Sequence, residues 1–121
     1  MNKLETTMKI LESFPAADPA GLFSINYNMA GSVFSLNYSS IVHFASESSL
    51  QPQLIRAREQ ALQLIDTRIG DLKSQFREMT GATLQLEDLG GNDGLEVISA
   101  TSNSPRKISY FRLTRKFEVK P

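Results

Sequence analysis

Cysteine and tryptophan are both missing from this 121-residue chain, and histidine occurs only once, at His43. Without cysteine there are no disulfides, no thiolate metal ligands and no cysteine nucleophiles. Basic residues (Lys and Arg) and acidic residues (Asp and Glu) number 13 each, so the formal net charge is zero. A balanced charge does not imply a domain-wide attraction to nucleic acid or to an anionic membrane.

Long apolar runs are missing as well. No run approaches the ~18 residues that would indicate a membrane-spanning helix. The first 14 residues contain Glu5 and Glu12 and lack the uninterrupted apolar core of a secretory signal. We therefore expect a cytoplasmic protein with no membrane contact. The length predicts that residues 1–121 form a single domain.

Apolar residues recur at helical spacing between Ser48 and Gly81, which predicts one long amphipathic helix. Pro52 suits a first turn, and Gly81 can adopt the left-handed conformation that closes a helix. Arg68 and Asp71 have the spacing of an ion pair on the helix surface. About 29 residues would extend ~43 Å, whereas a domain of this size is about 28–35 Å across. The helix should therefore extend beyond its own sheet or meet another subunit.

The apolar stripe of this helix has two interpretations. It packs on the protein's own sheet, or its seven-residue repeat also forms a helix–helix seam in a dimer. Arg58 lies inside the stripe, where its stem can cover the core while its head reaches water, or where it can contact a ligand or partner. The candidate seam consists of Ile55, Arg58, Leu62, Ile65, Ile69, Leu72 and Phe76.

The remaining residues predict a second helix and several strands. Alternating apolar and polar side chains indicate half-buried strands, and glycine-containing links indicate turns. The result is an α+β fold in which antiparallel strands pack against the long helix. We expect a helix at 2–14, a hairpin at 22–38 with a third strand at 41–45 that is separate or continuous with the second, and, after the long helix, strands at 83–89, 95–100 and 107–119 with turns at 90–94 and 101–105.

Charge is segregated near the C-terminus. Five acidic and no basic residues lie between positions 78 and 96, while the last strand is basic and carries interleaved aromatic residues. One interpretation is cross-strand pairing of the acidic and basic segments. The other is a basic edge strand that binds a phosphate backbone or an acidic partner segment. The candidate binding strand contains Arg106, Lys107, Tyr110, Arg112, Arg115 and Lys116.

No constellation in the sequence predicts catalysis, a metal or a cofactor. His43 lies between apolar residues of a predicted strand and has no Ser-His-Asp signature or second histidine beside it. Asn92, Asp93 and Gly94 lack the spaced acidic ligands of a calcium loop and fit a hairpin turn instead. We expect no catalytic residues, no metal site, no cofactor and no small-molecule substrate.

The order helix, strands, helix, strands over residues 1–100 is similar to that of the small dimeric chaperones of type III secretion. Those proteins pair through a helix or strand and wrap an effector, so the similarity implies a dimeric, chaperone-like protein. This chain differs from them in its longer central helix, its lack of acidic excess and its basic last strand where a helix is expected. Because element order recurs across unrelated functions, the similarity assigns no residues.

The sequence therefore favours a non-enzymatic binding, adaptor or accessory protein that works as a homo-oligomer, of a chaperone-like, phage or bacterial kind. The alternative is a nucleic-acid-binding module that uses the basic C-terminal strand. Zero net charge makes a protein partner more plausible than nucleic acid, because affinity for a phosphate backbone follows clustered positive charge.

Overall fold

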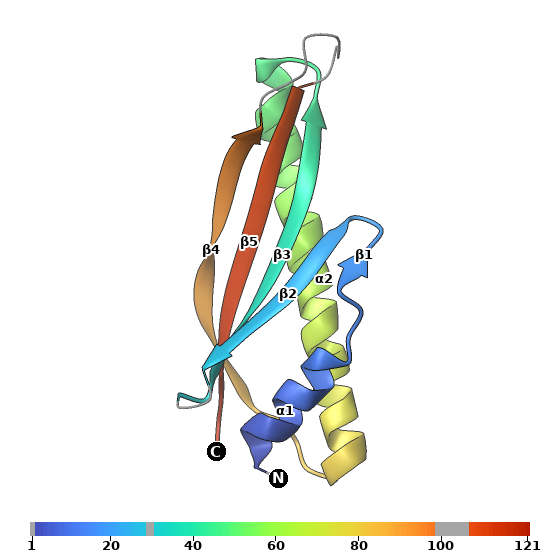
Figure 1. Ribbon diagram of the computed structural model, residues 1–121, viewed down its shortest axis with the longest axis vertical. Coiled ribbons are helices and arrows are strands. Elements are labelled where there is room, and N and C mark those ends of the chain that lie inside the picture. The colour runs from blue at the N-terminus through green and yellow to red at the C-terminus, as the bar shows by residue number, and fades with distance from the viewer. Residues whose placement is uncertain (1, 29–30, 99–106) are drawn as a thin grey trace.

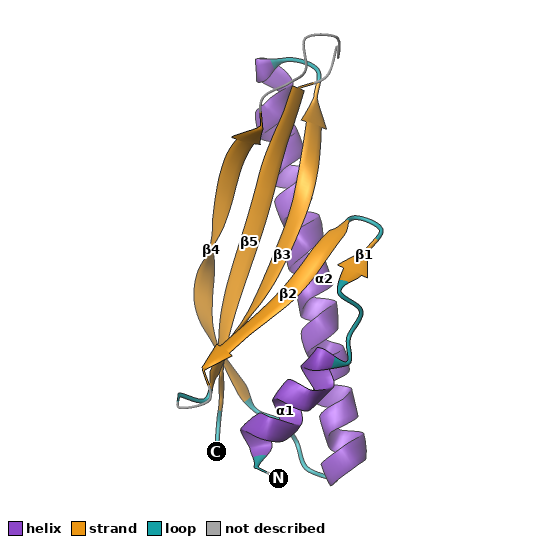
Figure 2. Ribbon diagram, in the orientation of Figure 1, coloured by secondary structure: helices purple, strands orange, loops and turns teal. Residues whose placement is uncertain are grey.

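The computed structural model describes residues 2–28, 31–98 and 107–121. Two helices and one five-stranded antiparallel sheet form the fold, which confirms the α+β class and the predicted order of elements (Figures 1 and 2). The elements are α1 (Lys3–Glu12), β1 (Ala17–Asp18), β2 (Gly21–Asn28), β3 (Val33–Phe44), α2 (Glu47–Thr80), β4 (Leu86–Ile98) and β5 (Lys107–Val119).

The sheet has the strand order β1-β2-β3-β5-β4, so β5 lies inside the sheet and β4 is an edge strand. β5 pairs with β3 from Val33 opposite Glu118 to Phe44 opposite Lys107. On its other side it pairs with β4 over nearly its whole length. β3 is one continuous strand, which settles the alternative that the sequence left open at 39–40.

Both ends of α2 are closed by local hydrogen bonds. The backbone N–H of Ser46 donates to the Ser49 side chain at 3.1 Å, and the backbone N–H of Ser49 donates to the Ser46 carbonyl at 2.9 Å, so the helix begins at Glu47, one residue before the predicted Ser48. Gly81 has φ of 73° and ends the helix in the left-handed conformation, as predicted. The helix therefore runs unbroken for 34 residues.

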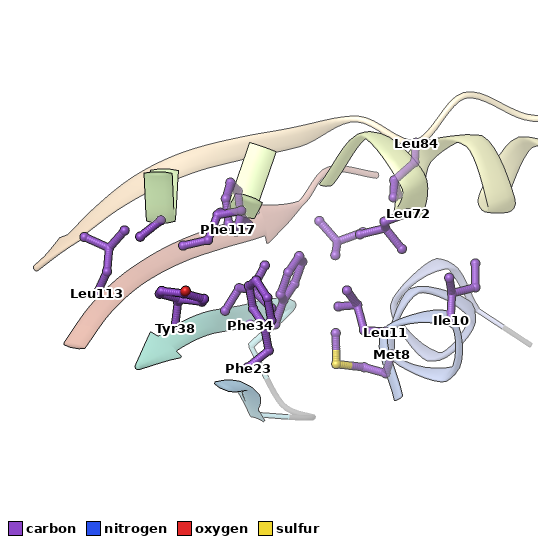
Figure 3. Close-up of a cluster of buried hydrophobic side chains, with 14 of the residues drawn as sticks. Met8, Ile10, Leu11, Phe23, Phe34, Tyr38, Leu72, Leu84, Leu113 and Phe117 are labelled. Atoms are coloured by element: carbon purple, nitrogen blue, oxygen red, sulfur yellow. The ribbon is translucent and has the colours of Figure 1, made fainter. Parts of the chain in front are cut away.

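One stripe of α2 packs on the helix-facing side of the sheet. Leu54, Ala61, Ile65, Leu72 and Phe76 are all at most 3 % exposed. They meet the buried side chains of β3 and β5, including the Phe34–Phe117 pair, whose ring centroids lie 5.5 Å apart (Figure 3). The predicted stripe was wrong at Ile55, which is 47 % exposed.

The far end of α2 is covered by α1. At 34 residues the helix is ~51 Å long, whereas strands of 12 or 13 residues extend ~40–44 Å. Met8 and Leu11 of α1 pack beside Leu72 of α2 and Leu84, which precedes β4 (Figure 3). The long helix is therefore covered at this end from within the same chain and needs no second subunit there.

β4 runs straight through the segment predicted as a turn at 90–94, so that prediction was wrong. A bulge between Asp88 and Gly90 absorbs one residue, and pairing then continues from Gly90 to Ile98. A Cβ at Gly91 would collide with the backbone carbonyl of Thr114 on β5. Glycine is therefore used at 91 for the close approach of two strands and not for a turn.

Gly91→Ala should destabilise the protein by about 1–3 kcal/mol, because β5 has to move to accommodate the methyl group. Gly94 lies three residues further along the same strand, where a Cβ meets nothing within 4 Å. Gly94→Ala is therefore the matched control and should change stability by less than about 0.5 kcal/mol. Urea unfolding of both variants measures the difference, and equal stabilities would contradict the close approach.

Candidate functional site

The structure divides the predicted helix seam into buried and accessible members. Ile65, Leu72 and Phe76 are 1 %, 0 % and 3 % exposed and pack in the core of the subunit itself. These three are inaccessible to a partner, so including them in a seam was wrong. Ile55 is exposed, and Leu62 and Ile69 are half-buried. The accessible residues keep the seven-residue spacing, which places them on one side of the helix.

That side of α2 faces the edge strand β4. Arg58, which lies on the same side of the helix, has its Nε 2.6 Å from the Oδ2 of Asp93 on β4. The two side chains are 35 % and 39 % exposed, so the ion pair contributes less than about 1 kcal/mol. The half-exposed Arg58 therefore connects α2 to the edge strand β4.

β4 exposes apolar side chains at its end. Leu95, Val97 and Ile98 are 44 %, 72 % and 41 % exposed. Leu95 and Val97 lie opposite Phe111 and Ser109 of β5 and thus share the helix-facing side of the sheet, while Ile98 lies on the other side. We call the surface made by Ile55, Leu62 and Ile69 of α2 with Leu95 and Val97 of β4 the α2–β4 flank.

The prediction of a basic edge strand was wrong about the edge, because β5 lies between β3 and β4. Tyr110, Arg112 and Lys116 share the open side of the sheet, and the Arg112 guanidinium lies 5.7 Å from the centroid of the Tyr110 ring. Arg115 lies on the opposite, helix-facing side, where it is half-buried. Lys107 pairs with Glu47 at 2.8 Å. Arg106 lies outside the described residues.

β4 and β5 do place the acidic and basic segments side by side, as the pairing interpretation predicted. The ion pair formed is Glu87 with Lys120, whose Nζ lies 2.6 Å from Oε2. The hydrogen bond lowers the pKa of the Glu87 carboxyl, and the same bond raises the pKa of the Lys120 ammonium. Both groups are exposed, so the pair fixes local geometry more than it adds stability.

Arg68 is a buried cation that the sequence analysis assigned to a surface pair with Asp71. The structure places it against the β1 region instead, where it donates to the Pro15 carbonyl at 2.8 Å and to the Asp18 carboxylate at 2.7 Å. Its guanidinium carbon lies 3.9 Å from the centroid of the Phe23 ring. No local pattern marks this contact, because its partners are about 50 residues away.

Arg68→Ala should destabilise the protein by about 2–4 kcal/mol, because it leaves the Pro15 carbonyl and the partly exposed Asp18 without their cation. Arg68→Lys should restore little of this loss, since one ammonium cannot reproduce the planar two-point contact or the stacking on Phe23. Arg77, exposed on the same helix, is the control, and Arg77→Ala should cost less than about 0.5 kcal/mol. Equal unfolding midpoints for the two alanine variants would contradict this role.

His43 lies at the end of β3 with an exposed side chain on the open side of the sheet. Among the described residues, no three His, Asp or Glu side chains gather closely enough to hold a metal ion. Over the same residues, neither helix is long and apolar enough to cross a membrane. Two features of the described surface remain as candidates for a functional contact: the unpaired strand edges and the exposed apolar side chains.

Comparison of the chain with protein-family models, with curated proteins and with solved structures finds no significant match.

Proposed function

We propose that this protein is a non-enzymatic binding protein of an adaptor or chaperone-like kind that works as a homo-oligomer, with the α2–β4 flank as the contact between copies. The observation that carries the proposal is β4 itself. It is a 13-residue edge strand whose outer backbone pairs with no other described strand and whose last residues are exposed and apolar.

Edge strands of monomeric proteins usually carry features that prevent pairing with another chain. These features include charged side chains, especially lysine, as well as proline, β-bulges, short length and cover by a helix or loop. β4 contains no lysine and no proline, and it is as long as the central strand β5; its charges are four carboxylates, and Asp93 among them is paired with Arg58. Its bulge lies near the start of the strand, so the stretch from Gly90 to Ile98 remains regular. Such a strand is suited to association.

A second copy of the chain fits this edge by charge and by register. An antiparallel β4–β4 pair with its two-fold axis at Asp93 would place Glu96 opposite Gly90 and Leu95 opposite Gly91. The acidic side chains away from the axis then avoid one another. The two Asp93 side chains meet at the axis, where each is already paired with its own Arg58. Like charges directly opposite one another would otherwise disfavour the pair.

The size of the contact fits a weak, reversible dimer. In this register the regular stretch pairs residues 90–96, which extend ~24 Å, and a helix layer on a sheet is ~20 Å high, so each subunit buries about 500 Å². Stable interfaces bury about 800 Å² from each partner, and weak or transient ones bury less. Ile55, Leu62 and Ile69 of the two copies would lie along the same side of the joined sheet and add apolar contact to the backbone pairing.

The nucleic-acid alternative receives less support from the geometry. Arg112 and Lys116 lie on the open side of the sheet, whereas Arg115 lies on the other side. Glu118 shares the face of Arg112 and Lys116, and Glu96 lies opposite Tyr110 on that face. A phosphate backbone binds best to clustered positive charge, and this face mixes both signs.

Val97→Lys tests the proposed contact. Val97 is 72 % exposed in the subunit, so the substitution should leave folding intact while placing a charge in the interface between copies. We expect self-association to weaken at least about tenfold, which is about 1.4 kcal/mol. Sedimentation velocity at micromolar concentration measures the change. Met79→Lys is the matched control, because it adds the same charge at an exposed apolar residue outside the flank.

Two results would contradict the proposal. The first is a wild-type protein that sediments as a monomer at micromolar concentration. The second is a Val97→Lys variant that associates as strongly as Met79→Lys, because the contact between copies would then lie elsewhere.

A further inference from the structure

A second unpaired stretch of strand lies away from β4, along the edge of β3 that faces β2. β2 pairs with β3 only as far as Leu22 opposite Ser39. β5 continues along the other side of β3 to Phe44. At Ser40 the edge is covered by the residues just before β2, because the Ser40 hydroxyl donates to the carbonyl of Ala20 at 2.6 Å. Residues 41–44 of β3 therefore have a strand on one side and, among the described residues, none on the other.

A hollow lies beside this edge on each of the two faces of the sheet. The hollow on the helix side has a volume of about 310 Å³ and is bounded by β3 and the first half of α2. The hollow on the open side has a volume of about 370 Å³ and is bounded by β3 and the segment from Ala17 to Leu22. Both include Ala20, Ser40 and Ile41, so they meet along the same strand. We call residues 41–44 with the two hollows the β3 notch.

The two hollows differ in chemistry. The helix-side hollow has a mixed polar and apolar lining, in which Arg56 supplies the cation beside Gln53, Gln60 and the buried Tyr38. Arg56 is exposed and has no ion pair with another described residue. His43 also borders this hollow, although its side chain lies on the open side of the sheet.

The open-side hollow is mainly apolar. Leu22 and Ile41, which line it, are 61 % and 53 % exposed. The carboxylate of Asp18 also borders this hollow, and it is neutralised by Arg68. The negative charge on this side is thus compensated, while on the helix side Arg56 has no ion pair with another described residue.

We propose that the β3 notch binds an extended segment of another protein in which apolar residues alternate with acidic ones. The segment adds a short strand beside residues 41–44, and its backbone satisfies the unpaired groups of β3. Successive side chains of a strand point to opposite faces, so alternate residues enter opposite hollows. Apolar residues then contact Leu22 and Ile41, and carboxylates reach Arg56.

This site goes beyond the proposed self-association and is independent of it. The notch lies on the β2 side of β3, whereas the α2–β4 flank lies beyond β5. A monomeric protein therefore keeps the notch, and the Val97→Lys variant can be used to test it alone. Failure of one proposal leaves the other standing.

The probe is a labelled peptide of alternating valine and glutamate, with a peptide of alternating valine and lysine as the control. Fluorescence anisotropy with the full chain should show tighter binding of the glutamate peptide. Arg56→Glu should weaken that binding at least about tenfold and favour the lysine peptide, because the helix-side charge is reversed. Arg77→Glu makes the same change at an exposed position of α2 outside the notch and should leave binding unchanged.

The location is tested separately from the charge. In amide NMR spectra of the Val97→Lys variant, the glutamate peptide should shift residues 41–44 and Arg56 and leave β4 unchanged. A version of the peptide N-methylated along its pairing edge should not bind, because it lacks the backbone donors of an added strand. Each of four results would overturn the proposal. The glutamate peptide does not bind, or it binds equally to wild type and to Arg56→Glu. The NMR shifts are confined to β4, or the methylated peptide binds as well as the unmethylated one.

Discussion

A single long helix must cover a sheet that is wider than the helix. An α-helix with its side chains is ~10 Å across, whereas five strands at ~4.8 Å spacing extend ~19 Å between the outer strand axes. The buried stripe of α2 accordingly packs over β3 and β5 at the middle of the sheet. The two flanks of α2, which lie beside this stripe, contact the outer strands β1 and β4.

The two flanks of α2 make different contacts. On the β1 side, Arg68 is buried and reaches Asp18, the Pro15 carbonyl and the face of Phe23, so this side is closed around Arg68 and stays open only at the hollow beside Arg56. On the β4 side, Arg58 makes a half-exposed ion pair with Asp93, and the apolar residues beside it remain accessible. The end of α2 beyond the sheet is covered by α1.

The same constraint leaves two unpaired strand edges with different chemistry. The β4 edge is long and acidic and has apolar residues at its end. The edge at residues 41–44 is short and lies between a hollow of mixed lining that contains Arg56 and a mainly apolar hollow. A protein with one edge suited to its own copy and another suited to a different chain would connect the two. Such a connection is what an adaptor requires, and it uses backbone pairing and apolar contact and involves no reacting group.

Local rules were enough to locate several elements from the sequence. Helical periodicity and Gly81 located α2 to within a residue at its end, and alternation of apolar residues located β5 at Lys107–Val119. How these elements meet depends on contacts that only the folded chain makes. The strand order that puts β5 inside the sheet, the use of Gly91 for close approach and the burial of Arg68 all depend on residues distant in sequence. Periodicity shows that a residue faces an apolar surface, but it cannot say which surface covers it, and for Ile55 and Phe76 the answers are opposite.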